Sequence, residues 1–347
     1  MRLEPAPRVV DWTLFALVSG LVSTGIATAL AGTAGRWWVF AAHTAGAVLF
    51  IVVLGWKLRR VASRLRPDAW TRGTWTSVLT GVLAVVALGT GIGWTLGAPV
   101  WVAGLSWLTI HAVVGVLLLA ALLVHLRYRY HGLAAADFEG RRSVLRYALL
   151  AGLGGVAWRL QESVIELIWA TRRYTGSRER GSFAGNAMPV TMWAADDPAP
   201  VDPEAWTLSI EGAVEERREI EYEALQDDRE LRAVLDCTSG WYAVQDWRGV
   251  RVGDLLADVG ETADARWVRF VSVTGYRWSL PIDEARDALL ATHVSGEALD
   301  HGHGRPLRLV APGRRGYQWV KWVETVEVRR TPDLGQWLAI FTSGFDE

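Results

Sequence analysis

The sequence predicts a multi-domain protein in which an all-α transmembrane bundle of five helices is followed by an α+β domain. Four long apolar runs lie in the first half of the 347 residues, and short strand-like segments lie in the second half. Residues 1–175 carry 17 Lys and Arg against 7 Asp and Glu, whereas residues 176–347 carry 19 against 30. The net charge of −1 therefore hides a basic apolar half joined to an acidic polar half.

The four apolar runs each approach the ~20 residues that are needed to cross ~30 Å of hydrocarbon. They extend over about Val9 to Leu30, Val39 to Trp56, Ser77 to Leu96 and Trp101 to Leu126. A soluble helical core is the alternative interpretation, but four such runs with so few internal charges would not stay in solution. A lipid membrane is thus the first partner that the sequence predicts.

The connections between the runs predict the orientation of the bundle. Those that follow the second and fourth runs are rich in arginine, and the other two are short and nearly uncharged. Because cytoplasmic loops carry the excess of Lys and Arg, the basic connections and the N-terminus should be cytoplasmic. The chain is then a multi-pass protein of the cytoplasmic membrane, and a fifth span would deliver the second domain to the extracytoplasmic side.

The fifth helix is predicted over residues 143–169 and is unusual for a span. Its apolar part, Tyr147 to Trp158, covers only ~18 Å at 1.5 Å per residue, so a full crossing must include charged residues. Arg141 and Arg142 precede it, and this pattern resembles an internal twin-arginine export signal. An ordinary basic flank of a membrane helix is the alternative. The predicted domains are residues 1–170 for the bundle, 171–200 for a linker, 201–330 for the α+β domain and 331–347 for a tail.

Strands are expected in the second half at Trp206 to Ile210, Trp267 to Val273, Leu307 to Val310 and Trp322 to Val328, with a helix over Asp283 to Thr292. No basic patch with interleaved aromatic residues suggests a nucleic-acid partner. No Ser-His-Asp set, zinc-spaced cluster or phosphate loop favours hydrolase or transferase chemistry.

One cysteine and a basic block stand out in this half. Cys237 is the only cysteine, and Lys321 is one of two lysines in a chain with 34 arginines. The block contains His303, Pro306, Arg308, Pro312, Gly313, Gly316, Lys321 and Trp322. A thiolate suits a soft metal, and converging cationic donors suit a phosphate.

This layout resembles the molybdopterin domain of the sulfite oxidase family over roughly residues 183–330. The resemblance implies a molybdenum–molybdopterin cofactor with Cys237 as the thiolate ligand of molybdenum. It implies that His303, Arg308 and Lys321 contact the pterin or its phosphate. It also places Asn186 at the cofactor, within a segment similar to the R-N-H-x-P-V motif of the family, and Tyr276 at the pocket as a catalytic residue or as a half-buried strand tyrosine.

The resemblance implies oxygen-atom transfer with a small oxygen-atom donor or acceptor as substrate. Gly185 and Ala187 replace the arginine and histidine of the family motif, which leaves fewer cations for a sulfite dianion. A neutral sulfoxide therefore fits better, as in the methionine-sulfoxide reductase branch. Two alternatives stay open: a sulfite dehydrogenase, and a non-catalytic membrane scaffold that binds haem or cofactor.

Two histidines of the first half, His43 and His111, lie in the second and fourth apolar runs. Histidine within a membrane span is costly and tends to be functional, and with these two residues the first half resembles a small membrane cytochrome b. They would be the axial ligands of one b-type haem, which would exchange electrons with the quinone pool. His125 has no such partner, because Lys57 occupies the position fourteen residues after His43. The alternative is that these histidines bond to a neighbouring helix or line a quinone site.

Overall fold

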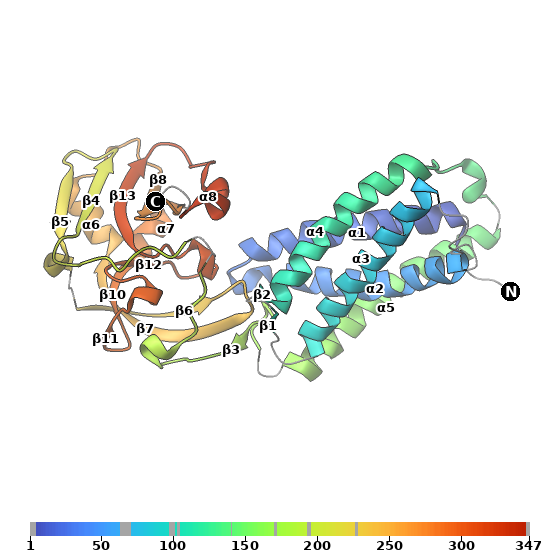
Figure 1. Ribbon diagram of the computed structural model, residues 1–347, viewed down its shortest axis with the longest axis horizontal. Coiled ribbons are helices and arrows are strands. Elements are labelled where there is room, and N and C mark those ends of the chain that lie inside the picture. Colours follow the sequence, from blue (N-terminus) through green and yellow to red (C-terminus); the bar gives the residue numbers. More distant parts are fainter. Residues whose placement is uncertain are drawn as a thin grey trace. The chain divides into compact units, whose positions relative to one another are not determined.

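The computed structural model describes residues 5–62, 71–96, 101–102, 105–139, 141–169, 172–192, 196–225 and 228–344 (Figure 1). The chain divides into two compact units, residues 1–176 and residues 177–347. The first unit is helical and the second contains two β-sheets. The predicted order of a helical bundle and an α+β domain is confirmed.

The described part of the first unit contains five α-helices. They are α1 (Pro7–Leu30), α2 (Trp37–Val61), α3 (Arg72–Leu96), α4 (Trp107–Arg129) and α5 (Arg141–Trp169), with short 3-10 turns η1 (Ala34–Arg36) and η4 (Ala135–Asp137) and a small hairpin of β1 (Trp101–Val102) and β2 (Leu105–Ser106). Proline stands in the first position of α1, where its missing N–H costs no hydrogen bond. The Ser106 hydroxyl accepts the backbone N–H of Thr109 and caps α4.

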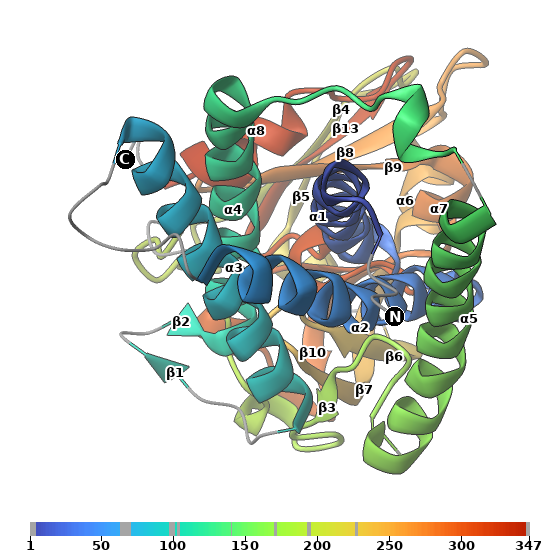
Figure 2. The ribbon, with the colours of Figure 1, turned by 90° about the vertical axis from the view of Figure 1, so that its right-hand side faces the viewer.

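The helices pack in the order α3, α4, α1, α2 and α5, each against the next. Figure 2 shows α3 and α5 at opposite edges of this bundle. The interior is made of apolar side chains from four helices, including Val18, Phe50, Ala84 and Leu118. The outward faces are apolar as well, as Val85 on α3 and Val116 on α4 illustrate. Such all-round apolarity is typical of helices in a membrane.

Within the part of the chain that the structure describes, four helices are long and apolar enough to cross a membrane: Pro7–Leu30, Ala34–Val61 (α2 with its preceding turn), Arg72–Leu96 and Trp107–Arg129. The expected five-span bundle is therefore corrected to four candidate spans. The helix expected over residues 143–169 is present as α5, but its apolar part is short and is followed by Arg159, Glu162 and Glu166. Its interior is too charged for it to count as a span.

The second unit is built from two mixed sheets. One has the order β11-β10-β7-β3, with β12 paired to β10 and β6 paired to β7, and the other has the order β5-β4-β13-β8-β9. The strands are β3 (Arg178–Glu179), β4 (Thr207–Gly212), β5 (Arg218–Glu221), β6 (Arg229–Asp236), β7 (Trp241–Arg251), β8 (Trp267–Ser272), β9 (Arg277–Pro281), β10 (Leu289–Val294), β11 (Glu297–Ala298), β12 (Arg308–Val310) and β13 (Val323–Arg329). The helices are α6 (Val252–Val259), α7 (Ile282–Asp287) and α8 (Gln336–Thr342), and 3-10 turns are η5 (Gly185–Ala187), η6 (Tyr222–Leu225), η7 (His301–His303) and η8 (Gly316–Gln318).

The sheet that contains β7 carries the residues of interest. β7 lies centrally, antiparallel to β6 and β10 and parallel to β3. Its side chains alternate between buried and half-buried positions over eight residues, which is the period of a strand with two different faces. Cys237 lies in the β6–β7 turn, His303 lies in the segment before β12, and Lys321 lies in the segment before β13.

Three local predictions differ from the structure. The helix expected over Asp283 to Thr292 ends at Asp287, and β10 begins at Leu289, because Leu289, Leu290 and Ala291 are buried between β7 and β12. Local helix propensity is overridden here by sheet pairing. Within the expected linker, β3 pairs with β7, so residues from 177 onward belong to the second unit.

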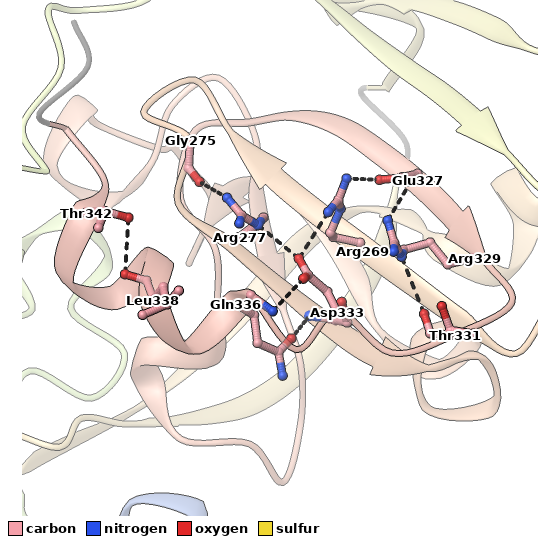
Figure 3. A network of polar contacts seen from close by, with 12 residues as sticks. Arg269, Gly275, Arg277, Glu327, Arg329, Thr331, Asp333, Gln336, Leu338 and Thr342 are labelled. Atoms are coloured by element: carbon pink, nitrogen blue, oxygen red, sulfur yellow. Dashed lines mark hydrogen bonds and ion pairs between the residues drawn. The ribbon is translucent and has the colours of Figure 1, made fainter.

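The expected tail is also part of the second unit. Asp333 precedes α8 and accepts hydrogen bonds from Arg269 Nη1 at 3.0 Å and Arg277 Nε at 2.9 Å (Figure 3). Gln336 accepts the backbone N–H of Ser279 at 2.8 Å, and Ala339 is buried. These contacts attach α8 to the sheet of β8 and β9.

Candidate cofactor site

Cys237 lies at the tip of the β6–β7 hairpin and is buried. Its N–H donates to the Trp241 carbonyl at 2.9 Å, and its carbonyl accepts the N–H of Gly240 at 3.1 Å. Gly240 has φ of 97°, a conformation that glycine adopts without strain. The sulfur lies 3.0 Å from the Ser239 hydroxyl and accepts the Ser239 N–H at 3.5 Å. Both Ser239 groups can stabilise a thiolate.

A buried ion pair holds the main chain of Cys237 in place. The preceding residue, Asp236, pairs with Arg315 (Oδ1 to Nη1, 2.8 Å) and accepts the Ser177 hydroxyl at 2.7 Å. Arg315 also donates through Nη2 to the carbonyl of Cys237 at 3.2 Å. A Cβ added at Gly316 would lie 3.2 Å from the Cα of Cys237, so the Arg315 segment packs directly on the cysteine backbone.

Replacing Arg315 by methionine should destabilise the protein strongly, because the Asp236 carboxylate would be left buried without its guanidinium. Breaking a buried pair in this way costs about 3–5 kcal/mol. The change would be measured as a shift in the denaturant midpoint of the full chain in detergent. The double variant Asp236→Asn with Arg315→Met removes both charges and should recover part of the loss. Equal midpoints for the single and double variants would contradict this assignment.

Arg308 is the first residue of β12 and is only 3 % exposed. Its guanidinium donates through Nη1 to the His303 carbonyl at 2.9 Å and lies over the rings of Trp247 and Trp319. Burial lowers the pKa of Arg308 to about 10, an effect opposed by Cys237 and Asp300. Its Nε has no hydrogen-bond partner, and no carboxylate forms an ion pair with it, among the described residues. A buried cation of this kind needs an anion.

His303 is 1 % exposed and is oriented by Asp300. Its Nδ1 lies 2.7 Å from Asp300 Oδ1, which also accepts the His303 backbone N–H. Burial and then Arg308 lower the pKa of His303, against the opposing effect of Asp300, and the lowered pKa favours the neutral ring. Because a carboxylate only accepts, the proton resides on Nδ1. The buried Nε2 is then an acceptor, without a partner in the described part of the chain.

Asn186 supports this arrangement indirectly, through its contact with Asp300. Its Oδ1 accepts the backbone N–H of Asp300 at 3.0 Å, and its Nδ2 donates to the Ala298 carbonyl at 2.8 Å. The Asn186 amide therefore positions Asp300, which in turn orients His303. The structure shows a supporting contact for the residue that the sequence predicted at the cofactor.

Lys321 is hydrogen-bonded to the segment that contains His303. Its ammonium donates to the carbonyls of Gly302 at 2.6 Å and Thr191 at 3.2 Å, and it lies over the ring of Trp322. Burial, followed by Arg308, lowers the pKa of Lys321 from 10.5 to about 7. Gly304 has φ of 106°, and a Cβ there would lie 3.0 Å from the Lys321 Cβ, so glycine allows the two segments to meet.

The low pKa of Lys321 predicts a pH dependence of stability in the cofactor-free chain. Below about pH 7 both states carry the charge, and the folded state bears the full cost of burying it. Between about pH 7 and pH 10 the folded state loses the proton first, so the free energy of unfolding should rise with pH. Lys321→Met lacks the group and should show a weaker rise in the same denaturation series. Identical pH profiles for the two chains would contradict the prediction.

Tyr276 lies just before β9, and its hydroxyl donates to the Tyr317 carbonyl at 2.5 Å. Burial, with contributions from Tyr317 and Asp196, raises its pKa, and Asp196 also raises the pKa of Lys321. Tyr276 and Lys321 thus share Asp196 as an electrostatic neighbour. The Tyr276 hydroxyl is already bonded to the main chain, so Tyr276 is suited to shaping the pocket.

The structure brings Cys237, His303, Arg308 and Lys321 together, since each affects the charge or hydrogen bonding of another. Their donor set fits a molybdenum–pterin group. It provides a thiol beside two cations, and His303 Nε2 and Arg308 Nε are buried without a hydrogen-bond partner among the described residues. Sequence reasoning did not identify the supporting residues Ser239, Trp247, Asp300, Arg315 and Trp319. In the sequence, the position of Asp300 three residues before His303 could have predicted that Asp300 orients the His303 ring.

A second constellation lies inside the helical bundle. The rings of His43 on α2 and His111 on α4 have centroids 6.1 Å apart and are nearly perpendicular. His43 Nδ1 lies 3.0 Å from the Thr24 hydroxyl, and His111 Nδ1 lies 2.9 Å from the Ala87 carbonyl. Each ring is therefore held through Nδ1 by a neighbouring helix.

Small residues leave room for both rings. A Cβ added at Gly25 would lie 3.5 Å from His43 Cε1, and one at Gly91 would lie 3.0 Å from His111 Cε1. His125 is placed differently, since its Nδ1 lies 3.4 Å from the hydroxyls of Thr76 and Ser77. Lys57 instead pairs with Asp11 at 2.7 Å. The structure thus joins His43 to His111 and leaves His125 outside the pair.

Comparison with known proteins agrees with the geometry of the second unit. Residues 195–337 match the family described as oxidoreductase molybdopterin binding domain. The chain is 32 % identical over 146 residues to the protein-methionine-sulfoxide reductase catalytic subunit MsrP of Xanthomonas axonopodis pv. citri, which covers 36 % of this chain and 44 % of the relative. The MsrP subunit of Gluconobacter oxydans is 29 % identical over 168 residues, which covers 42 % and 52 %.

The chain spans about half the length of these curated relatives. A solved structure, the sulfane dehydrogenase SoxCD from Paracoccus pantotrophus, is 26 % identical over 39 % of this chain and 40 % of that chain, with a TM-score of 0.37. This structural overlap is too small to bear on the assignment. With its cysteine, its basic block and the match over residues 195–337, the second unit belongs to the sulfite oxidase family of molybdopterin-binding oxidoreductase domains.

Proposed function

We propose that this chain is a membrane-bound molybdopterin-dependent oxidoreductase that reduces a sulfoxide by oxygen-atom transfer, with electrons supplied through a b-type haem from the quinone pool. The observation that carries the proposal is the convergence of the buried thiol of Cys237 with Arg308 and Lys321. When bound, molybdenum supplies two-electron oxygen-atom transfer. The name of the relatives, protein-methionine-sulfoxide reductase, supports the choice of a sulfoxide.

The protein groups have separate tasks in this proposal. The Cys237 thiolate would ligate molybdenum, and Ser239 would stabilise its charge with two hydrogen bonds. Arg308 would provide the buried positive charge for the cofactor phosphate, and Lys321 would be a second cation for an anion. The Nε2 of His303 would be available to accept a hydrogen bond from the cofactor, because Nδ1 faces Asp300.

The pocket suits a neutral substrate better than a dianion. Gly185 is buried with φ of 56°, and a Cβ there would lie 2.8 Å from the Glu297 carboxylate. An arginine at this position, as in the family motif, would therefore be strained. Of the other cations near the thiol, Arg315 is already paired with Asp236. Among the described residues, this leaves fewer cationic donors for a sulfite dianion than the family motif provides.

The His43–His111 pair supports one b-type haem. His43 on α2 and His111 on α4 would hold the haem iron between them, since their ring centroids lie 6.1 Å apart and each ring is fixed through Nδ1 by a neighbouring helix. When bound, the iron supplies one-electron transfer, and the membrane location makes a quinol the natural electron source.

The distribution of arginines supports an extracytoplasmic position for the oxidoreductase domain. Arg8, Arg59, Arg60, Arg72, Arg127 and Arg129 lie at the helix ends remote from His43 and His111 along each helix. This end should be cytoplasmic. The four candidate spans alone would bring the chain back to this end. An extracytoplasmic domain therefore requires that α5, which starts there and packs on α2, also crosses the membrane despite its charges; with 29 residues it is about 43 Å long.

The proposal is tested by assaying both directions on the purified full chain. We expect quinol-driven reduction of methionine sulfoxide and little oxidation of sulfite. Faster sulfite oxidation would favour a sulfite dehydrogenase. If neither reaction occurs in protein that contains molybdenum and haem, the chain is a scaffold and the proposal is wrong.

A further inference from the structure

The C-terminal helix of the second unit, α8, and the turn before it carry exposed apolar side chains. Leu334 is 79 % exposed, Leu338 67 % and Phe341 64 %, and Trp337 is also exposed. Trp337, Leu338 and Phe341 lie on α8, and Leu334 lies in the turn just before the helix. The spacing of three to four residues between Leu334, Leu338 and Phe341 favours one side of the helix. We call these four residues the α8 face. In an ordinary soluble domain the outward side of such a helix is polar. In α8 the outward side is apolar instead.

The opposite side of α8 is firmly attached to the domain. Ala339 and Ser343 are buried on this side. The partly exposed ring of Trp337, at the edge of the α8 face, also packs edge-on against Trp278 with centroids 5.0 Å apart. The start of the helix is held by Asp333 and its two arginines, as Figure 3 shows. The α8 face is therefore presented on a fixed support.

The chemistry of the α8 face favours lipid over protein. Residues 334–344 contain no Asp, Glu, Lys or Arg, although residues 176–347 are strongly charged. Protein interfaces usually carry a polar rim, whereas tryptophan, phenylalanine and leucine together are typical of segments at a membrane surface. The same chain contains four helices that can cross a membrane, so a bilayer is tethered to this domain at high effective concentration.

We propose that the α8 face docks into the surface of the bilayer in which the helices of the same chain are embedded. The inserted Leu334, Trp337, Leu338 and Phe341 would restrict the motion of the oxidoreductase domain at the membrane. The inference rests on the membrane placement of the first unit proposed above, and its test separates the two.

The test uses the full chain with single cysteines labelled with bimane in phosphatidylcholine nanodiscs, with one chain in each disc. Leu338→Cys reports on the α8 face. Val85→Cys, exposed on α3, reports on a membrane span, and Arg217→Cys, exposed between β4 and β5, reports on a polar surface. The unsubstituted chain gives the background from buried Cys237. Phosphatidylcholine brominated on its acyl chains quenches the label only where lipid touches it.

We expect brominated lipid to reduce the emission at positions 338 and 85 but not at 217. Adding Leu334→Asp should restore emission at position 338, because a charge in the α8 face opposes insertion. If position 85 is quenched and position 338 is not, lipid does not cover α8 and this proposal is wrong. If position 85 also escapes quenching, the membrane placement itself fails, and the inference fails with it.

Discussion

Replacing Cys237 by serine should reduce sulfoxide reduction by about a thousandfold, which corresponds to about 4 kcal/mol at 1.36 kcal/mol per factor of ten. Serine offers a hard oxygen ligand where the cofactor requires a soft thiolate. The smaller oxygen fits the same hairpin tip, and the Ser239 donors remain next to it. The loss should therefore appear in turnover and not in folding.

Molybdenum content distinguishes a chemical role of Cys237 from a structural one. In the proposed site, Arg308, His303 and Lys321 would still hold the pterin in Cys237→Ser, so metal analysis should find molybdenum at close to the wild-type ratio. Ser239→Ala is the matched control, since it removes one hydrogen bond to the sulfur and should cost about 10- to 100-fold at most. Full turnover in Cys237→Ser would exclude the thiolate as a ligand and with it the proposed reaction.

Replacing either His43 or His111 by alanine should abolish the b-type band in the redox-difference optical spectrum. One iron needs both rings, which lie 6.1 Å apart between centroids, and the loss of one axial ligand leaves the haem held from a single side. The spectrum would be recorded on detergent-solubilised chain, normalised to protein. Haem content by extraction should fall in parallel.

His125→Ala is the matched control for this experiment. It removes an imidazole from the same helix as His111, but one whose Nδ1 faces Thr76 and Ser77. The band should persist at wild-type intensity. A band that survives His43→Ala and His111→Ala, or that disappears in His125→Ala, would show that the haem assignment is incorrect.

The helices of the first unit could be predicted closely because a continuous apolar run is a local signal. The run Val39 to Trp56 became α2 over Trp37–Val61, and Ser77 to Leu96 became α3 over Arg72–Leu96. α5 shows the limit of this signal. It forms a helix of 29 residues, but its charges remove it from the candidate spans.

Pairing between distant segments decided what local patterns could not. Leu289 and Leu290 have a helical context in the sequence, yet they form β10 because β7 and β12 supply backbone partners on both sides. In the same way, residues 178–179 lie in a polar stretch and still extend the sheet through β7. Hydrogen bonds between strands depend on which segments meet, and that is not encoded in a short window.

The sequence by itself supplied the residues on which the proposed chemistry rests: a lone thiol, a basic block that contains Lys321, and two histidines within apolar runs. These residue types have few alternatives, so their presence predicts a soft metal, an anion and a haem. Only the tertiary structure decided how these groups are held. The Asp236–Arg315 pair joins residues 79 positions apart, Asn186 turned out to support Asp300, and α8 turned its apolar side outward. Such contacts depend on burial and distance in three dimensions, which no local pattern of residues specifies.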